Sequence, residues 1–340
     1  MTSLGRIDPA TRYPDGTPID PNAPARPYVL RELHADLVRG KGRALLASTP
    51  LLLLSIAALV AGGLYPELLG VLIWIGVIGV TAYAEEAFEW LALRRADPLT
   101  SIEKDAREEA ERIAFQADYR LRVTTRRPVA MLALLAVIAA VTIVEFVVAA
   151  RTSFPHVLTS AALVKPAVRD GEWWRLLTAT YLHGNLMHLL ANLSALVVLG
   201  EMLEAYEGRR RMPLVYLVAA VAGSVCSTLV SSRTSLGASG GIIGFAGYLV
   251  VAAGRSPAGA PRLVRGRMLR FLGATAVLGL AGITFIDNGG HLGGFLGGAA
   301  IGLLLPRGDA RRERLVTALG GVSTAILAAG AAFTVYRLLR

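Results

Sequence analysis

Four polar side chains stand in apolar surroundings and have the types that acyl transfer requires. Ser239 lies between glycines in SLGASGGIIGFAG (235–247), and the others are His188, Asn192 and His291. A serine hydroxyl becomes an effective nucleophile when a neutral histidine takes its proton, and hydrogen-bond donors must face the oxyanion that then forms. These types supply a nucleophile, a base and oxyanion donors. The flanking glycines would let a peptide backbone approach the serine oxygen.

Each of these residues also has a simpler explanation. Taken alone, Ser239 is better explained by a close contact between helices, because polar residues commonly join membrane helices. Glu145, within the span 129–150, is interpreted in the same way. A zinc site is a weak alternative, since His183 and His188 are five apart, whereas HExxH places its histidines four apart and includes a glutamate. Residues 237–241 match G-x-S-x-G by accident, because that motif needs a strand before the serine.

The composition indicates a membrane protein. Of 340 residues, 54% are hydrophobic and 18% are charged, whereas about 25% are charged in a typical soluble domain. The apolar residues stand in long blocks, and the net charge of +10 comes largely from arginines in the short connections between them. Membrane topology explains this distribution better than binding to nucleic acid, which we do not expect. The single cysteine, Cys226, excludes a disulfide framework.

The apolar blocks predict an all-α polytopic membrane protein. A helix that crosses the bilayer needs about 20 mostly apolar residues. The candidate spans are 44–64, 68–84, 129–150, 182–202, 213–231, 238–254, 269–286, 289–305 and 315–336. The first two form a hairpin that could instead be re-entrant, because only Tyr65, Pro66 and Glu67 separate its halves.

The spans divide the chain into five segments. We predict a polar, proline-rich cytoplasmic tail (1–43), a transmembrane hairpin (44–84), a charged linker or amphipathic helix (85–128), a core of six spans (129–305), and a linker with a C-terminal span (306–340). The hairpin and the last span carry no motif, so we assign them no role beyond anchoring or regulation.

The arginines set the expected orientation. Three connections carry three, five and four arginines: 201–212, 255–270 and 306–314. Of the alternate connections, 232–237 and 287–288 carry one arginine and none, whereas the long connection 151–181 carries Arg151, Lys165, Arg169 and Arg175, a mild contrary signal. Basic loops face the cytoplasm, so the N-terminus is expected inside and the candidate serine and histidines toward the outer face. Arginine outnumbers lysine 32 to 3, as in GC-rich bacterial genomes, so we expect a bacterial plasma membrane.

Small residues predict a close contact between two of the spans. One glycine series accompanies His291 and the other follows Ser239: Gly293, Gly294, Gly297, Gly298 and Gly302, against Gly240, Gly244 and Gly247. Small residues four apart let helices approach closely. This packing would bring the histidine to the serine.

The segment from about 129 to 305 resembles the rhomboid family of intramembrane serine proteases. GASG at 237–240 resembles the nucleophile motif of that family, which implies Ser239 as nucleophile between Gly237 and Gly240. His291 in GHLGG resembles the general base. The further matches follow in the family's order. Trp174-Arg175 resembles the W-R motif of the first outer loop, and His183 resembles an earlier histidine of the same helix. His188 and Asn192 resemble the pair implicated in the oxyanion site, and Gly200, Glu204 and Gly208 resemble the pattern G-x-x-x-E…G.

One position departs from the family pattern. Many members carry an aromatic residue four positions after the serine, packed against the histidine, whereas this chain has Ile243. The resemblance further implies a Ser-His dyad without a third acidic member, and the sequence agrees, because no acid lies mid-helix near His291. Asp287, four residues earlier, is interpreted as a loop residue.

The resemblance implies hydrolysis of peptide bonds in or next to transmembrane segments, near the outer membrane face, in protein substrates within the lipid bilayer. Neither a metal nor a cofactor is expected. The runner-up is a rhomboid-like protein that binds membrane clients without cleaving them. A transporter or channel is disfavoured, because Glu145 is the one clear charged candidate along a mid-membrane path. The sequence leaves the natural substrates and the oligomeric state open.

Overall fold

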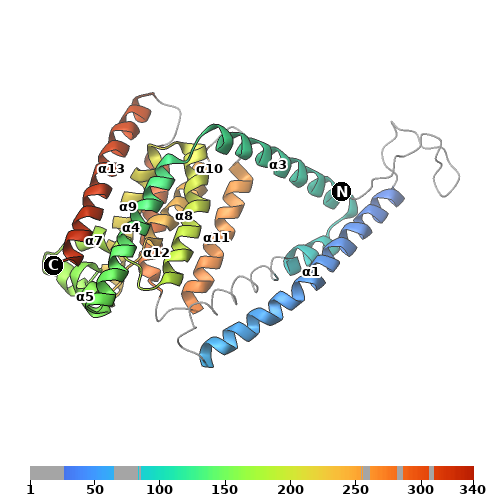
Figure 1. Cartoon of the computed structure of the whole chain (residues 1–340). Coiled ribbons are helices and arrows are strands. Elements are labelled where there is room, and N and C mark those ends of the chain that lie inside the picture. Colours follow the sequence, from blue (N-terminus) through green and yellow to red (C-terminus); the bar gives the residue numbers. More distant parts are fainter. Residues whose placement is uncertain are drawn as a thin grey trace. The chain divides into compact units, whose positions relative to one another are not determined.

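The computed structural model describes residues 27–64, 83, 86–253, 255, 261–281, 286–305 and 310–340 (Figure 1). Within these ranges the regular elements are helices, joined by one isolated antiparallel bridge between Leu163 and Ser235. The chain forms two compact units. One comprises Met1–Leu51 and Ala82–Glu109, and the other comprises Leu52–Thr81 and Ala110–Arg340.

The N-terminal unit is helical where the sequence predicts a polar tail. Helix α1 runs over Pro27–Leu64, so residues 27–43 are helix, because good helix formers such as leucine, arginine and alanine follow the last proline of the tail. Residues 86–95 are also helical, and Lys41 forms an ion pair with Glu89. The rest of the predicted tail (1–26) and the predicted second span (68–84), apart from Tyr83, lie outside the described residues.

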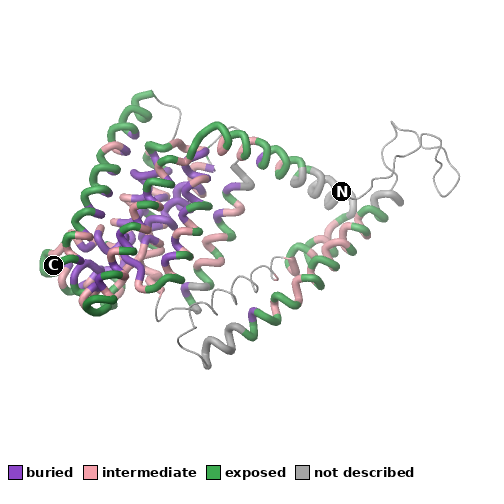
Figure 2. The backbone as a smooth tube through the Cα atoms, viewed as in Figure 1, coloured by how far each residue is buried: buried purple, intermediate pink, exposed green. Residues whose placement is uncertain are grey.

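Within the described residues, the larger unit contains a bundle of seven helices, the number expected for the core and the last span. They are α4 (Val129–Arg151), α8 (Leu186–Glu207), α9 (Arg211–Val230), α10 (Ser239–Ala253), α11 (Pro261–Ala281), α12 (Asn288–Leu304) and α13 (Ala310–Leu338). Helices α4, α8, α9 and α13 are long and apolar enough to cross a membrane, and α10 is a shorter apolar helix. The protein is thus an all-helical, polytopic membrane protein. Figure 2 shows that buried residues concentrate inside this bundle.

The predicted linker contains helix α3 (Pro98–Thr125), whose last turns pack on the bundle. The rings of Phe115 and Tyr119 lie 6.2 and 6.3 Å from the ring of Tyr206 in α8, centroid to centroid. The guanidinium of Arg267 in α11 lies 4.6 Å above Phe115. Cation–π contacts and aromatic stacking therefore hold this end of α3 to two helices of the core.

The glycine contact predicted from the sequence is present at the centre of the bundle. A methyl group added to Gly298 of α12 would lie 1.9 Å from the carbonyl oxygen of Gly244 in α10, and one added to Gly294 would lie 2.1 Å from that of Gly240. The other face of α12 packs equally closely on α9, where a methyl group on Gly293 would lie 2.5 Å from the Ala222 carbonyl oxygen. Helix α12 is thus wedged between α9 and α10, with backbone against backbone on both sides.

A chain of short helices covers one end of the bundle. They are α5 (Phe154–Ala161), α6 (Lys165–Arg169), α7 (Arg175–Thr178) and the 3-10 turn η2 (Ala179–Tyr181). The hydroxyl of Tyr181 donates to the carbonyl of Leu327 in α13 over 2.8 Å, and both atoms are buried. The last span, to which the sequence assigns no motif, is therefore packed into the core.

The packing of α10 on α12 predicts that Gly298→Ala destabilises the protein by about 1–3 kcal/mol, because a backbone carbonyl must move to admit the methyl group. Gly321→Ala in α13 is the matched control, since nothing lies within 4 Å of the added atom. The control should be neutral or slightly stabilising, because alanine favours helix. Thermal unfolding in detergent measures both variants. Equal midpoints would contradict the close contact.

Candidate active site

The serine and the histidine singled out in the sequence meet at one end of the bundle. Ser239 is the first residue of α10, and His291 lies in the first turn of α12. The Nε2 atom of His291 lies 2.9 Å from the Ser239 Oγ atom, within hydrogen-bond distance. Both residues are half-buried, and the Nδ1 atom of His291 is buried without a hydrogen-bond partner among the described residues. The imidazole can thus accept the serine proton on Nε2 while Nδ1 carries its own proton.

The start of α12 is fixed by Asp287, a residue predicted to lie in a loop. It is the N-cap: its carboxylate accepts a hydrogen bond from the backbone N–H of Gly290 over 2.9 Å. The hydroxyl of Ser227 in α9 donates to its other oxygen. The cap satisfies one of the free N–H groups at the helix start and sets where α12 begins, one turn before His291.

His183 lies outside α8, although the sequence places it at the start of a span. The helix begins at Leu186, because Asn185 caps it by accepting the N–H of His188 over 2.8 Å. The ring of His183 is fully buried in the preceding loop. Its Nδ1 atom lies 3.1 Å from the Thr142 hydroxyl, and its Nε2 atom accepts the N–H of Ala238 over 3.5 Å.

His183 is also held through its backbone. Its N–H donates to a carboxylate oxygen of Glu145 in α4 over 2.6 Å, within the protein interior. The sequence flags Glu145 as an unusual acid in a span but explains it by packing. The structure gives it this particular partner, which links α4 through His183 to Ala238, the residue before Ser239.

His188 and Asn192 share one face of α8, as their spacing predicts. The ring of His188 lies 5.1 Å from that of His183 and borders Gly237, where an added methyl group would meet the His188 Cε1 atom at 2.7 Å. The side-chain amide of Asn192 donates to the carbonyl of His188 over 2.9 Å. Within the described ranges, no three histidine, cysteine or acidic residues gather as a metal site would require.

The first turn of α10 adds backbone donors. The N–H groups of Ser239, Gly240 and Gly241 precede the first intrahelical bond, which Ile242 makes to Ala238, so none has an acceptor within the helix. The positive end of the helix dipole lies at the same place. This arrangement favours a negative charge beside Ser239.

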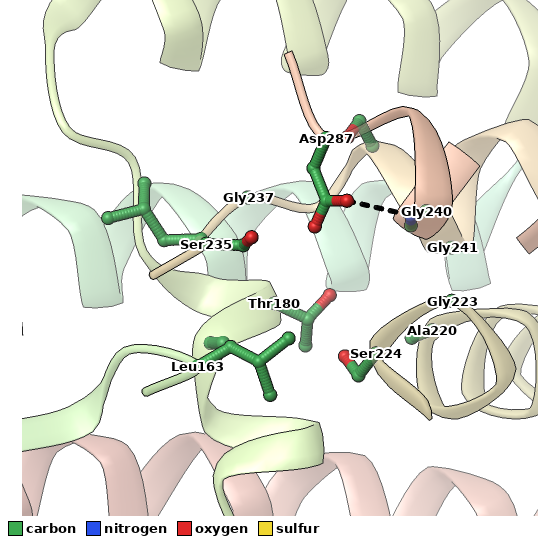
Figure 3. A pocket seen from close by; sticks show the side chains of 14 residues that line it. Leu163, Thr180, Ala220, Gly223, Ser224, Ser235, Gly237, Gly240, Gly241 and Asp287 are labelled. Atoms are coloured by element: carbon green, nitrogen blue, oxygen red, sulfur yellow. Dashed lines mark hydrogen bonds between the residues drawn. The ribbon is translucent and has the colours of Figure 1, made fainter. Parts of the chain in front are cut away.

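A small cavity adjoins the serine (Figure 3). Its volume is ≈ 40 Å³, and its lining includes Ser239 itself together with polar groups of Thr180, Ser224, Ser235 and Asp287. A polar space of this size can hold water. The dashed line in Figure 3 marks a hydrogen bond of the Asp287 carboxylate.

The other predicted supporting residues brace the surroundings of the site. Arg175 is buried and donates to the carbonyls of Ala162 and Thr159, and its guanidinium lies 4.4 Å above the ring of Trp174. Both residues therefore hold the covering loop, which is the segment 152–185 with the short helices α5, α6, α7 and η2. The carboxylate of Glu204, toward the other end of α8, accepts the two backbone N–H groups of Ala130 and Met131 and so caps α4.

Two further residues lie near Ser239 and His291. Ile243, at the position where many rhomboids have an aromatic residue, is buried in the core. Lys165 of α6 has a fully buried ammonium group near Asp287, and no motif in the sequence identifies it as a site residue. The available signal is that it is one of three lysines in the chain and lies in the long connection 151–181.

Comparison with known proteins gives a consistent result. Residues 170–308 match the model of the Rhomboid domain. The chain is 37% identical over 169 residues to Rhomboid protease GluP of Bacillus subtilis, covering 47% of this chain and 32% of that protein. It is 32% identical over 156 residues to RHOMBOID-like protein 5 of Arabidopsis thaliana, covering 45% and 50%. It is 28% identical over 133 residues to Inactive RHOMBOID-like protein 8 of Arabidopsis thaliana, covering 39% and 38%. The matched part spans no more than half the length of each relative.

The site geometry predicts a specific effect of Gly237→Ala. Gly237 and Gly171 both have positive φ, +127° and +105°, so alanine at either position carries backbone strain of about 1–3 kcal/mol. Only at Gly237 does the methyl group also collide with His188. We expect both variants to lose stability, and only Gly237→Ala to shift the imidazole NMR signals of His188. An unchanged His188 signal in folded Gly237→Ala protein would contradict this geometry.

Proposed function

We propose that this chain is an intramembrane serine protease of the rhomboid family, with Ser239 and His291 as its catalytic dyad, since residues 170–308 match the Rhomboid domain. The observation that carries the proposal is the 2.9 Å contact between His291 Nε2 and Ser239 Oγ at the start of a helix. A base in contact with a hydroxyl, beside free backbone donors, is the arrangement that acyl transfer needs.

The proposed reaction has two steps. The Ser239 oxygen attacks the carbonyl carbon of the substrate while His291 Nε2 takes the hydroxyl proton, and the resulting imidazolium passes that proton to the leaving amine as the peptide C–N bond breaks. A water molecule then gives its proton to His291 and attacks the acyl-enzyme, which releases the new carboxyl group and restores the serine hydroxyl. The cavity beside Ser239 could supply this water, because it is polar and large enough to hold one.

We assign the oxyanion to a position at the start of α10. The N–H of Ser239 is one donor, and the side chains of Asn192 and His188 are the other candidates. In the unbound protein the Asn192 amide donates to the His188 carbonyl, so one of its two N–H bonds remains to be offered to a substrate. Donors fixed in place before the reaction stabilise the developing charge without reorganisation.

The proposed substrates are transmembrane proteins. A peptide bond within a helix is shielded by its neighbours, so the substrate segment must unwind locally before the serine can reach it. Small residues at the cleavage point, which the family resemblance implies, would favour this. From the distribution of arginines we place the N-terminus in the cytoplasm and the site toward the outer face, in a bacterial plasma membrane.

We predict that Ser239→Ala and His291→Ala each reduce cleavage at least about a thousandfold, because nucleophile and base act as one unit. The assay is cleavage of a transmembrane reporter by the purified full-length chain in liposomes. Ser194→Ala is the control, because the hydroxyl of this exposed serine of α8 donates to the Leu190 carbonyl of its own helix. Equal cleavage by the wild type and Ser239→Ala would refute the dyad. Specific binding of a membrane protein by an uncleaving wild type would favour the client-binding alternative.

Asn192→Ala should lower kcat by about 10²–10³, the usual cost of losing an oxyanion donor. KM should change little, because the interaction forms in the transition state. The same reporter measured over a range of concentrations separates the two constants. A raised KM with unchanged kcat would instead assign Asn192 to substrate binding.

A further inference from the structure

A buried lysine connects three segments around the dyad. The side chain of Lys165, in the covering loop, has no exposed surface. Its ammonium group donates to the carbonyl of Arg233 and to the hydroxyl of Ser235, and lies 3.9 Å from the carboxylate of Asp287. The backbone of Leu163 adds two hydrogen bonds to Ser235, of 2.9 and 3.2 Å. The covering loop thus holds the segment that leads into Ser239.

The carboxylate of Asp287 is shared between the same parts. Besides capping α12 at Gly290, it accepts the hydroxyl of Ser227 in α9 and faces the Lys165 ammonium. The two serine hydroxyls, of Ser227 and Ser235, lie 3.5 Å apart. Four polar side chains from the covering loop, α9, the loop before α10 and the start of α12 therefore form one cluster.

The cluster is close in sequence to both members of the dyad. Ser235 precedes Ser239 by four residues, and Asp287 precedes His291 by four residues, or about one helical turn. The N–H of Gly237, between Ser235 and Ser239, donates to the Ala179 carbonyl over 2.9 Å. A shift of the cluster would therefore be transmitted along short, hydrogen-bonded backbone to the serine and to the imidazole.

The charges of Lys165 and Asp287 depend on each other. Burial lowers the pKa of Lys165, and the Asp287 carboxylate opposes that shift. Burial alone would raise the pKa of Asp287, but hydrogen bonds from Ser227, the Gly290 N–H and Ser235, with the Lys165 charge, hold it below its ordinary value. Asp287 thus stays ionised at neutral pH. Breaking a buried ion pair by removing one partner is costly, because it leaves the other charge uncompensated.

We propose that Lys165 and Asp287, with Ser227 and Ser235, form a clamp that positions Ser239 and His291 relative to each other. Lys165 and Asp287 are positioning residues: they act through the backbone on either side and touch no reacting atom. The effect of the clamp on rate rests on the proposed protease function, whereas its effect on the geometry of the dyad does not. Without the clamp, the starts of α10 and α12 remain packed, but the polar contacts that hold them in fixed positions relative to each other are lost.

The test compares Lys165→Met, Asp287→Asn and the double variant in the full-length protein. The first measurement is ¹⁵N NMR of the histidine rings in nanodiscs, where the five histidines are assigned by single substitutions. We expect the His291 ring signals to shift in each variant. The second measurement is reporter cleavage, where we expect kcat to fall about tenfold to a hundredfold with KM nearly unchanged, because small misplacements of reacting groups are costly.

The double variant separates a clamp from two independent residues. It removes both charges together, so it is also the variant that should fold where a single one does not. If the pair acts as a unit, the loss in the double variant is no greater than the larger single loss, whereas losses that multiply contradict the clamp. Arg169→Met is the matched control. It lies on the same short helix and donates to the Thr228 carbonyl, so the His291 signals should stay at their wild-type positions.

Two outcomes distinguish failure of the clamp from failure of the proposed function. If the folded double variant keeps wild-type His291 signals, the clamp is refuted, whatever the activity. If the wild type cleaves nothing, the protease proposal loses its support, but a shift of the His291 signals in the variants and not in Arg169→Met would still establish the clamp.

Discussion

The close approach of α10 and α12 is the constraint on which the site depends. Ser239 and His291 stand at the starts of these two helices, so the distance of 2.9 Å between their side chains depends on how closely the helices approach. Glycines on both helices provide that approach, with carbonyls of one helix against bare Cα atoms of the other. Lipid tails are as apolar as the helices, so there is little hydrophobic driving force for helices to associate in a membrane. Dispersion at this dense contact is therefore a main source of the attraction between α10 and α12.

The remaining elements fix the ends of this helix pair. The covering loop is tied to the bundle through buried polar groups that are nearly all satisfied by backbone: Arg175 by two carbonyls, Tyr181 by a carbonyl of α13, and His183 by Ala238 and Thr142. In a low-dielectric interior such bonds are expensive to break without a replacement partner. These hydrogen bonds fix the loop on the bundle, and the bond from the Ala238 N–H to His183 also holds the residue before Ser239.

Local signals in the sequence were sufficient for the helices of the bundle and for the approach of His291 to Ser239. The span expected at 129–150 is the helix Val129–Arg151, because a long apolar run leaves few alternatives. The glycine series predicted the α10–α12 contact, since spacing alone puts small residues on one face. The start of α8 was wrong by a few residues, because hydropathy does not detect the cap formed by Asn185. The clamp could not be predicted at all: Lys165 and Asp287 are far apart in sequence, and only the folded chain brings them together.

Treating the folded wild-type protein with a fluorophosphonate and locating the adduct by mass spectrometry shows whether Ser239 is a nucleophile activated by His291. We expect a single adduct on Ser239 that disappears in His291→Ala, because the free hydroxyl is a poor nucleophile without its base. An unlabelled Ser239 in folded wild-type protein would contradict it, as would labelling that persists unchanged without the histidine.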